Sequence, residues 1–437
     1  MNVPTKPRLA IQSFAFAAIC AVHSPTVWAG DGMPGDVLWS TSFGGTQPDF
    51  GEAVAAVPGG GFIVAGTTAS SGGGFEDAWL LRLDVDGALL WSRTIGAAAQ
   101  DFGTAVAPTS DGGFVVAGSS GIQTVAFNVM LAKTDAAGTL EWQRSFSAHA
   151  DSRGHAVRQL PDDGYVVVGD AGSDFYIIRT DAEGIAIWER TIHVDDDHAR
   201  AVALTDDGGF VVAGWIGDGS LFAEFDAALL KVNAAGDLVW QRQWDEGIDH
   251  RAYSVQNVGD GYVVGGQAGG VGSLWRTDAL GNRLWIRTLL DIDAGNVSSV
   301  EQAGDGGFVA GATAWRGTDG AYQMQLIKTD ALGQPEWSQV FGGAQYEWTG
   351  GACTGDDGRL VLAGTTNSIG AGGYDIYVVA VEVGQAADID DNGVVDVQDL
   401  LSVVVAWGPC DACAADVNGD GLVGIADLVL VISAWTG

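Results

Sequence analysis

A tryptophan recurs seven times along the chain, and a glycine stands four residues before each copy. The tryptophans are Trp39, Trp91, Trp142, Trp188, Trp240, Trp285 and Trp337, at intervals of 52, 51, 46, 52, 45 and 52 residues. The glycines are Gly35, Gly87, Gly138, Gly184, Gly236, Gly281 and Gly333. A period of this length indicates one supersecondary unit copied along the chain, so any fold must accommodate seven equivalent units.

Each unit has the pattern of a four-stranded meander. Six of the glycines close a turn such as "DVDG" or "DALG", where the last residue needs a positive φ. A second turn precedes a β-rich run, as in "DGGFVVAG". The segments between these turns, such as "GTAVAPT", "NVMLAKTD" and "TLEWQRSF", are apolar or alternate between apolar and polar residues, as β-strands do.

Units of this size match the blades of a β-propeller and are too long for leucine-rich repeats. Residues 35–44 supply a fourth strand without the first three, and residues 348–382 supply three strands without the fourth. Joined, they complete a seventh blade and leave no free sheet edge. The sequence therefore predicts a mainly β fold, with a seven-bladed β-propeller over residues 30–383 that is closed by an N-terminal strand.

Most of the basic residues follow the same repeat. One set stands two residues before the turn Asp or Asn: Arg82, Lys133, Arg179, Lys231, Arg276 and Lys328. The other stands two residues after the tryptophan: Arg93, Arg144, Arg190, Arg242 and Arg287. We expect both sets to serve the scaffold, with their stems packed on aromatic rings and some cation–π contact.

The units, for example "KTDAAGTLEWQRSFS", resemble the repeats of secreted bacterial β-propellers of the PQQ-like and WD40-like groups over about residues 35–383. This resemblance implies the fold only. Quinoprotein dehydrogenases are similar in repeat but usually have eight blades and two adjacent cysteines beside the cofactor, whereas Cys353 stands alone here. We expect Cys353 to be a buried small apolar residue and expect no quinone cofactor.

The N-terminus has the features of a secretory signal peptide over residues 1–29. Lys6 and Arg8 precede an apolar run from Leu9 to about Val22, and Val27 and Ala29 occupy the small cleavage positions. The alternative, a membrane anchor, requires a longer apolar run. We therefore expect a mature chain that starts near Gly30, a secreted or cell-surface protein, and no membrane span after cleavage.

The net charge limits the classes of partner. Lys and Arg total 20 against 55 Asp and Glu, which gives −35 at pH 7. Such a charge repels nucleic acids and anionic membrane surfaces and attracts divalent cations. We expect no nucleic-acid partner.

Two acidic loops, 28 residues apart, lie in the C-terminal segment 388–437, which follows a short linker at 384–387. They read "DIDDNGVVDVQD" (388–399) and "DVNGDGLVGIAD" (416–427), and both have the spacing of a twelve-residue calcium loop. The predicted ligands of two Ca²⁺ ions are Asp388, Asp390, Asn392, the Val394 carbonyl, Asp396 through water and Asp399, then Asp416, Asn418, Asp420, the Leu422 carbonyl and Asp427.

A polar turn is the alternative, but a turn does not require this spacing in two copies. Residues 388–437 contain nine Asp and no Lys or Arg, so we expect this segment to need a cation to fold. Cys410 and Cys413 could close a disulfide, whereas a zinc site would need further Cys or His residues nearby.

Asp at loop position twelve, one helix after each loop and the 28-residue duplication resemble type I dockerin modules. The resemblance implies a cohesin-like partner, often on a scaffold among polysaccharide-degrading proteins. Val397, Gln398, Ile425 and Ala426 stand where cellulosomal dockerins commonly carry hydroxyl residues. The partner therefore stays open between a cohesin and another cell-surface protein, and a role in stability or surface retention is a further alternative.

Histidines cluster around blades 3 to 5, in segments that we place in the inter-blade loops. Candidate catalytic residues there are His155, His198, Arg200, His250 and Tyr253, which are able to do acid–base chemistry or hold an anionic sugar. Other loops expected on this face, such as "TTNSIGAGGYD", are rich in Gly, Ser, Thr and aromatic residues and suit contact with a protein or a sugar.

The sequence thus favours a secreted, non-catalytic propeller that binds a protein or carbohydrate ligand, or takes part in surface assembly, and carries a calcium-dependent docking module. The alternative is a polysaccharide-acting enzyme, a lyase or a glycoside hydrolase, with its site in the inter-blade loops of blades 3 to 5.

Overall fold

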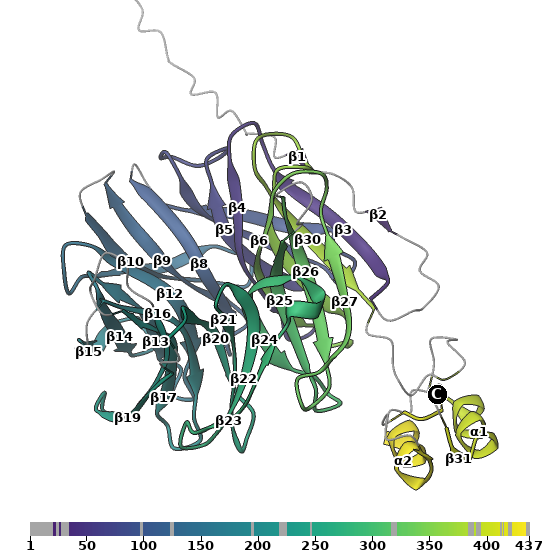
Figure 1. The fold of residues 1–437 in the computed structure, drawn as a ribbon. Helices are drawn as coiled ribbons and strands as arrows, with labels where there is room; N and C mark the ends of the chain where they lie inside the picture. The colour runs from purple at the N-terminus through teal and green to yellow at the C-terminus, as the bar shows by residue number, and fades with distance from the viewer. Residues whose placement is uncertain are drawn as a thin grey trace, which may run out of the picture.

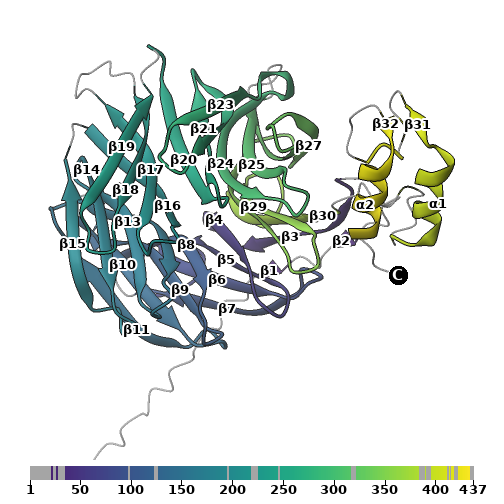
Figure 2. The same cartoon turned by 90° about the horizontal axis from the view of Figure 1, so that it is seen from below.

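The computed structural model describes residues 21–22, 26–27, 35–96, 99–122, 126–193, 196–217, 225–244, 247–315, 321–382, 389, 395–410, 413, 415–417 and 422–433. Seven antiparallel sheets make up the larger part (Figure 1). Each innermost strand contacts the innermost strand of the next sheet, and the seventh contacts the first, so the sheets form a closed ring. Figure 2 shows these innermost strands near the middle of the ring and the outermost strands at its edge. The seven-bladed propeller predicted from the repeats is confirmed.

The first three blades each contain four consecutive strands, ordered from the innermost to the outermost. Blade 1 consists of β4 (Asp49–Ala56), β5 (Phe62–Thr68), β6 (Asp77–Leu83) and β7 (Leu89–Ile95). Blade 2 consists of β8 (Gln100–Pro108), β9 (Phe114–Ile122), β10 (Ala126–Thr134) and β11 (Leu140–Phe146). Blade 3 consists of β12 (Ser152–Gln159), β13 (Tyr165–Ala171), β14 (Asp174–Thr180) and β15 (Ala186–Ile192).

The next three blades repeat this order. Blade 4 consists of β16 (Asp196–Leu204), β17 (Phe210–Gly217), β18 (Asp226–Val232) and β19 (Leu238–Trp244). Blade 5 consists of β20 (His250–Asn257), β21 (Gly261–Ala268), β22 (Val271–Asp278) and β23 (Arg283–Thr288). A 3₁₀ turn, η1 (Leu290–Ile292), leads to blade 6, which consists of β24 (Ala294–Gln302), β25 (Phe308–Trp315), β26 (Tyr322–Thr329) and β27 (Pro335–Phe341).

The seventh blade joins the two ends of the repeat region. Its inner three strands are β28 (Glu347–Thr354), β29 (Leu360–Thr366) and β30 (Asp375–Val381), and its fourth is the early strand β3 (Val37–Gly44). β3 pairs antiparallel with β30, with Trp39 opposite Ala380. Two short strands, β1 (Ala21–Val22) and β2 (Thr26–Val27), pair with the outer edge of β3. They lie within the predicted signal peptide, so cleavage near Gly30 would remove both.

The hydrophobic core lies between neighbouring blades. The second and third strands are buried along almost their whole length, as in β5 and β29, while the outermost strands alternate between partly buried and exposed residues. Val168 and Phe175 of blade 3, for example, pack with Val212 and Leu230 of blade 4 in one buried cluster. Burying such a side chain contributes about 1.5–3 kcal/mol to folding, so the sheets hold one another in place.

Each repeat tryptophan lies against the glycine turn of the next blade. A Cβ atom built on Gly87 would lie 2.5 Å from the ring of Trp39, and one built on Gly184 would lie 2.5 Å from the ring of Trp142. At the closure of the ring, the Trp337 ring of blade 6 lies 3.6 Å from the corresponding point at Gly35. The turn glycine is therefore needed both for its positive φ and for the space that the neighbouring indole occupies.

Aromatic and cationic contacts complete this inter-blade joint. Trp91 packs on Phe114 of the next blade with ring centroids 5.7 Å apart, and five other repeat tryptophans pack on the equivalent Phe or Tyr. The arginine two residues after the tryptophan lies over the same ring in five blades. The pairs are Arg93–Trp91, Arg144–Trp142, Arg190–Trp188, Arg242–Trp240 and Arg287–Trp285, at 5.2–5.7 Å from the centroid. The cation–π role predicted for this set is confirmed.

Each residue of the other basic set stands directly opposite a repeat tryptophan in the adjacent strand, and most of the set also form an ion pair. Lys133, only 3% exposed, lies 2.7 Å from Asp111, an acid in the turn between the first two strands of its own blade. Lys231–Asp207, Lys328–Asp305 and Arg179–Asp162 repeat this pair at 2.6, 2.6 and 2.7 Å. A buried ammonium group requires a charged or hydrogen-bonding partner, and the turn supplies it. The scaffold role predicted for this set is confirmed, and the ion pair with the turn acid was not predicted.

The C-terminal segment is a small duplicated unit. The helices α1 (Val397–Val405) and α2 (Ile425–Ser433) lie 28 residues apart at both ends, pack against each other, and are shown in yellow in Figure 1. Buried residues of the two copies match in pairs, Val395 with Val423 and Val403 with Val431. Short strands β31 (Gly408–Pro409) and β32 (Leu422–Val423) pair, and Cys410 forms the predicted disulfide with Cys413.

No helix among the described residues is both long enough and apolar enough to cross a membrane. Cys353 is buried in β28, as predicted for a small apolar residue.

The contact between tryptophan and glycine predicts the effect of two matched substitutions. Gly184 and Gly208 have almost the same backbone φ, +74° and +75°, but only Gly184 faces a tryptophan, and a Cβ on Gly208 meets nothing within 4 Å. Both Gly→Ala changes place a Cβ atom on a left-handed backbone, which costs about 1–2 kcal/mol. Gly184→Ala should lower the free energy of unfolding by about 1–3 kcal/mol more, because it displaces Trp142. Urea unfolding followed by fluorescence measures the difference; equal effects of the two substitutions would contradict this role of Trp142.

Candidate functional site

A β-bulge interrupts the innermost strand of every blade at the same place. The residues left out of register, called the bulge ring here, are Glu52, Thr104, His155, Arg200, Tyr253, Ser298 and Gly350. A bulge re-aims its side chain and is common next to functional sites. The bulges lie near the middle of each innermost strand, for example at Glu52 of β4 and Arg200 of β16. The strand residues before each bulge lead to the face that carries the inter-blade connections and the loops between second and third strands, called the connector face below.

Asp170 takes over a scaffold role in blade 3 that hydroxyl groups perform elsewhere. Thr365 of blade 7 accepts a hydrogen bond from the backbone N–H of Gly51 in the next innermost strand, at 3.0 Å. Thr313 of blade 6 accepts the equivalent bond from Thr349, at 3.1 Å. In blade 3, Oδ1 of Asp170 accepts this bond from Ala199, at 2.9 Å. A carboxylate here keeps the scaffold bond and leaves a second oxygen for other partners.

Three side chains donate to that second oxygen. Oδ2 of Asp170 lies 2.8 Å from Nε2 of His155, 3.2 Å from Nδ1 of His198 and 3.2 Å from an Nη atom of Arg200. His155 and Arg200 are the bulge residues of blades 3 and 4, so the bulges bring them to a common carboxylate. Asp170, His155, His198 and Arg200 are called the Asp170 cluster below.

Protonation in this cluster follows from burial and hydrogen bonding. Burial alone would raise the pKa of Asp170, but hydrogen bonds from His155 and His198 and the charge of Arg200 hold it well below its usual value. Burial lowers the pKa of His155 despite the hydrogen bond to Asp170. The cluster therefore contains a carboxylate, a guanidinium and a neutral His155 near pH 7. The bond from Nε2 of His155 leaves its Nδ1 as an acceptor.

Trp215 extends the cluster toward blade 5. It follows Gly214 in β17, as Asp170 follows Gly169 in β13, and it is buried. Arg200 lies 4.5 Å and Arg251 5.5 Å from its ring centroid, and the rings of His198 and Tyr253 lie 5.3 and 5.4 Å away. Burial raises the pKa of Tyr253, which therefore stays protonated as a hydrogen-bond donor.

The structure separates the remaining histidines from this cluster. His250 is fully buried, with Nδ1 3.0 Å from the Ile248 carbonyl and its ring beside Trp275. His149 and His193 lie near Asp174, at 3.6 and 2.6 Å. Of the five candidate residues, His155, His198 and Arg200 converge on Asp170, Tyr253 joins through Trp215, and His250 packs inside the fold. The candidates also lie in innermost strands rather than loops, because these strands begin earlier than the sequence pattern indicated.

Glu52 is the acidic member of the bulge ring. Solvent reaches its side chain, but protein atoms surround it closely, and this desolvation raises the pKa of Glu52 to about 7. Sequence reasoning missed Glu52, Asp170 and Trp215. Alignment of the residue after the glycine of each second strand would have revealed two of them, because Thr67, Ser119 and Thr365 stand where Asp170 and Trp215 do.

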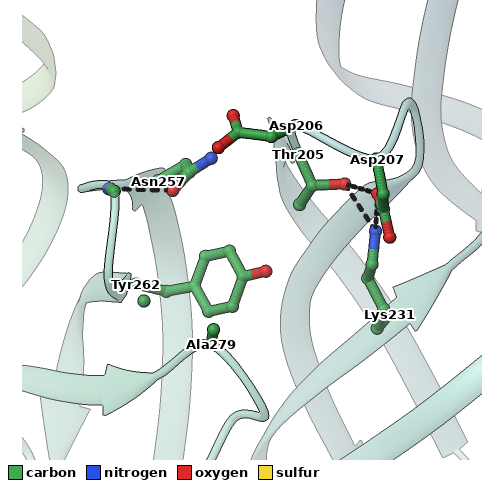
Figure 3. Close-up of a pocket in the computed structure, with 9 residues that line it drawn as sticks. Thr205, Asp206, Asp207, Lys231, Asn257, Tyr262 and Ala279 are labelled. Carbon is green, nitrogen blue, oxygen red and sulfur yellow. Dashed lines mark hydrogen bonds and ion pairs between the residues drawn. The ribbon is translucent and has the colours of Figure 1, made fainter.

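A cavity of about 200 Å³ lies between the turns of blades 4 and 5 (Figure 3). In that view the amine of Lys231 points toward Asp207 and Thr205, while the ring of Tyr262 lies across the cavity from them. Asp207 accepts hydrogen bonds from Thr205 and Lys231, each at 2.6 Å. Blade 2 repeats the arrangement with Thr109, Asp111 and Lys133, so these groups belong to the scaffold.

The predicted calcium ligands are described only in part. Asp388, Asp390, Asn392, Val394, Asn418 and Asp420 lie outside the described residues. Asp399 and Asp427, at position twelve of the two loops, are fully buried and accept the backbone N–H of position nine, from Asp396 at 2.8 Å and Gly424 at 2.7 Å. Asp396 also caps α1 through a bond from Gln398. Asp416 and Leu422 are described as well, and within the described part of the chain no three His, Cys, Asp or Glu residues are grouped to hold a metal.

Neither a protein-family profile nor a curated protein matches this sequence. Among solved structures, a protein of unknown function from Dyadobacter fermentans is 12% identical, with a TM-score of 0.48 over 80% of this chain and 100% of its own. Sqt1 from Chaetomium thermophilum is 15% identical, with a TM-score of 0.45 over 76% and 82% of the two chains. A candidate 6-phosphogluconolactonase from Bacteroides uniformis is 11% identical, with a TM-score of 0.48 over 73% and 92%. Likenesses this distant concern the fold and carry no activity over to this chain.

The lowered pKa of His155 predicts a pH dependence of stability. In the unfolded chain this histidine takes up a proton below about pH 6.5, whereas the folded protein resists the proton. The stability that neutral His155 contributes is therefore present above about pH 6.5 and is lost as the pH falls. Glu52 acts in the opposite direction, since a raised pKa contributes stability that is lost as the pH rises through about 7.

A comparison with His155→Gln cancels the contribution of Glu52. The urea midpoint at pH 7 minus that at pH 5 should be smaller in His155→Gln than in the wild type. His193→Gln, which alters an exposed histidine, is the control and should keep the wild-type difference. An unchanged difference in His155→Gln would show that its protonation is not coupled to folding.

Proposed function

We propose that the protein is a secreted, non-catalytic β-propeller that binds a glycan on its connector face and is retained at a surface by its calcium-dependent C-terminal segment. The observation that carries the ligand site is Asp170. A threonine would satisfy the scaffold bond, so the carboxylate and the three donors that it collects have a use beyond folding.

The chemistry of the cluster suits a hydroxyl-rich ligand. Glycans are recognised by fixed hydrogen-bonding groups next to aromatic surface, and this site combines a carboxylate, imidazoles and guanidinium groups with Trp215 and Tyr253. The side chains of the cluster are held by mutual hydrogen bonds, so little side-chain entropy is lost when a ligand binds.

Retention at a surface is supported by the two helices. Exposed apolar residues on α1 have counterparts 28 positions later on α2: Val397 with Ile425, Leu401 with Val429 and Val404 with Ile432. Such a duplicated apolar surface suits a protein partner, in accord with the resemblance to dockerins. The proposed occupant is a cohesin-like module or another cell-surface protein.

Calcium is the proposed cofactor of this segment. The described donors are hard oxygens, Asp399 and Asp427 are buried, and no Lys or Arg in residues 388–437 could neutralise them. A carboxylate oxygen has more than one acceptor position, so the backbone bonds of these residues leave room for a cation. When bound, the ion would neutralise the buried carboxylates of the two loops.

Replacing Asp170 by threonine tests the ligand site. Asp170→Thr restores the hydroxyl of blades 6 and 7 and keeps the bond to Ala199, so the urea midpoint should fall only by the cost of taking the carboxylate from Arg200 and the two histidines, and a wild-type circular dichroism spectrum confirms that the variant is folded. Binding to a glycan array that includes neutral and acidic oligosaccharides should fall by about tenfold or more, since three donors lose their common acceptor. Asp162→Asn, on the opposite side of blade 3, is the control and should bind normally. Undiminished glycan binding by Asp170→Thr would refute the proposal.

A polysaccharide-acting enzyme is the second candidate. The observation in its favour is that His155, His198 and Arg200 meet at one carboxylate beside Tyr253. A raised pKa makes Tyr253 a poor base but leaves it a possible proton donor. Release of reducing ends or unsaturated products from array ligands, lost in Asp170→Thr, would favour catalysis over binding alone.

The calcium proposal predicts a stoichiometry. Native mass spectrometry of the full chain should show two Ca²⁺ ions, and Asp399→Asn or Asp427→Asn should each remove one, because each change takes a charge from one loop. Asp411→Asn removes an equal charge between the loops and should retain both ions. Chelation should also expose the C-terminal segment to proteolysis. A wild-type chain that binds no calcium at millimolar concentration would overturn this part of the proposal.

A further inference from the structure

Six aromatic side chains form a continuous row on the connector face of blades 6, 7 and 1. In order of contact they are Trp315, Tyr322, Tyr346, Trp348, Tyr374 and Phe50, with successive centroids 4.9, 6.2, 6.1, 5.4 and 5.5 Å apart. They come from the end of β25, from the starts of β4, β26 and β28, and from the loop residues immediately before β28 and β30. This set is called the aromatic row.

The aromatic row is partly open to solvent. Trp315 is 44%, Tyr346 42% and Trp348 36% exposed. Rings of this size contribute most when they are buried, so an exposed contiguous set indicates a surface that a ligand covers. The repeat tryptophans show the contrast, since each of them packs on the next blade.

Two members of the aromatic row occupy the same strand positions in their blades as three residues near Asp170 occupy in theirs. Phe50 and Trp348 stand two residues before the bulge of their strands, where Arg153, His198 and Arg251 stand in blades 3, 4 and 5. One half of the face thus presents aromatic rings, and the other presents arginine and histidine against aromatic rings.

Hydrogen bonds hold the row in place. The backbone N–H of Tyr346 donates to Oδ1 of Asn367 at 2.7 Å, and the N–H of Asn367 donates to the Tyr346 carbonyl at 3.1 Å. Gln345 donates from its backbone to Ser368 at 2.9 Å, and Gln47 in the equivalent loop of the next blade donates to Ser70 at 3.1 Å. A ligand would therefore meet a surface that is already ordered.

The electrostatics of the row disfavour an anion. Its loops "GGTQ" and "GGAQ" contain no charged residue, and the nearby carboxylates of Asp49 and Glu347 are fully buried. Both carboxylates accept hydrogen bonds, from Ser70 and Thr366 respectively. Gln47 and Gln345 are exposed and offer neutral amide groups.

We propose that the aromatic row binds the sugar rings of an extended, neutral glycan chain. This inference rests on the proposed function and specifies the ligand. The apolar C–H faces of pyranose rings pack on aromatic faces, and the hydroxyl groups at their edges reach the amides of Gln47 and Gln345. A row of rings fits a chain of several sugars, whereas recognition of an organic cation uses aromatic faces that enclose the charge from several sides.

Tryptophan truncation in the full chain tests this assignment. The probes are cellohexaose, xylohexaose and mannohexaose, measured by isothermal titration calorimetry with the calcium-loaded protein. At least one should bind, and Trp348→Ala and Trp315→Ala should each weaken it by about tenfold or more. Leu332→Ala removes another exposed apolar side chain, in the turn between β26 and β27, and should bind like the wild type. Two variants from different loops, checked for an unchanged urea midpoint, keep the test valid if one of them misfolds.

Parallel titrations with oligogalacturonate, decaproline and octalysine distinguish other ligands. Binding of decaproline or octalysine without any neutral hexasaccharide would overturn the inference, as would full affinity of both tryptophan variants. Sugar binding that fails in Asp170→Thr but not in the tryptophan variants would leave the proposed function standing without the aromatic row. Loss in the tryptophan variants alone would support the row and refute the role of the Asp170 cluster.

Discussion

The packing of each repeat tryptophan on the glycine turn of the next blade is the contact on which the rest of the propeller depends. It joins a residue of one sheet to a backbone position of its neighbour, and at Gly87 and Gly184 a Cβ atom would lie 2.5 Å from the indole, too close to fit. Because the same contact occurs at Trp337 and Gly35, the ring closes only when β3 enters the seventh blade.

The repeat also explains why a few departures stand out. Each blade must satisfy the backbone N–H that precedes the bulge of the next innermost strand, and a threonine hydroxyl does so in blades 6 and 7. Asp170 satisfies the same requirement with one oxygen and gathers His155, His198 and Arg200 with the other. The proposed ligand site thus lies where a scaffold position tolerates more than one kind of acceptor. The cavity of Figure 3 shows the opposite case, because its Lys231 and Asp207 recur in other blades.

The fold was predictable because its determinants are local. Turn glycines and strand alternation repeat within each unit, and the incomplete units at residues 35–44 and 348–382 determine the closure. The convergence on Asp170 was not predictable in this way, since it joins β13 to bulges in β12 and β16 that propensity does not reveal. For the same reason the ion pair of Lys133 with Asp111, in the turn of its own blade, was not predicted. Sequence spacing identified His155, His198 and Arg200 as candidates. It could not distinguish them from His250, which is buried beside Trp275.

The two halves of the connector face favour the same kind of ligand. Arg153, Arg200 and Arg251 lie 3.2 Å from Asp151, Asp170 and Asp249 respectively, so each guanidinium is already matched by a carboxylate. The Asp170 side therefore offers directed hydrogen bonds with little net positive charge. The rings of the aromatic row carry no positive charge. A polyanion would also approach against the −35 charge of the whole chain, which opposes its encounter at any distance within the screening length. A ligand that spans both halves is then best recognised by ring faces and hydroxyl groups, which are the two features that a neutral sugar chain presents along its whole length.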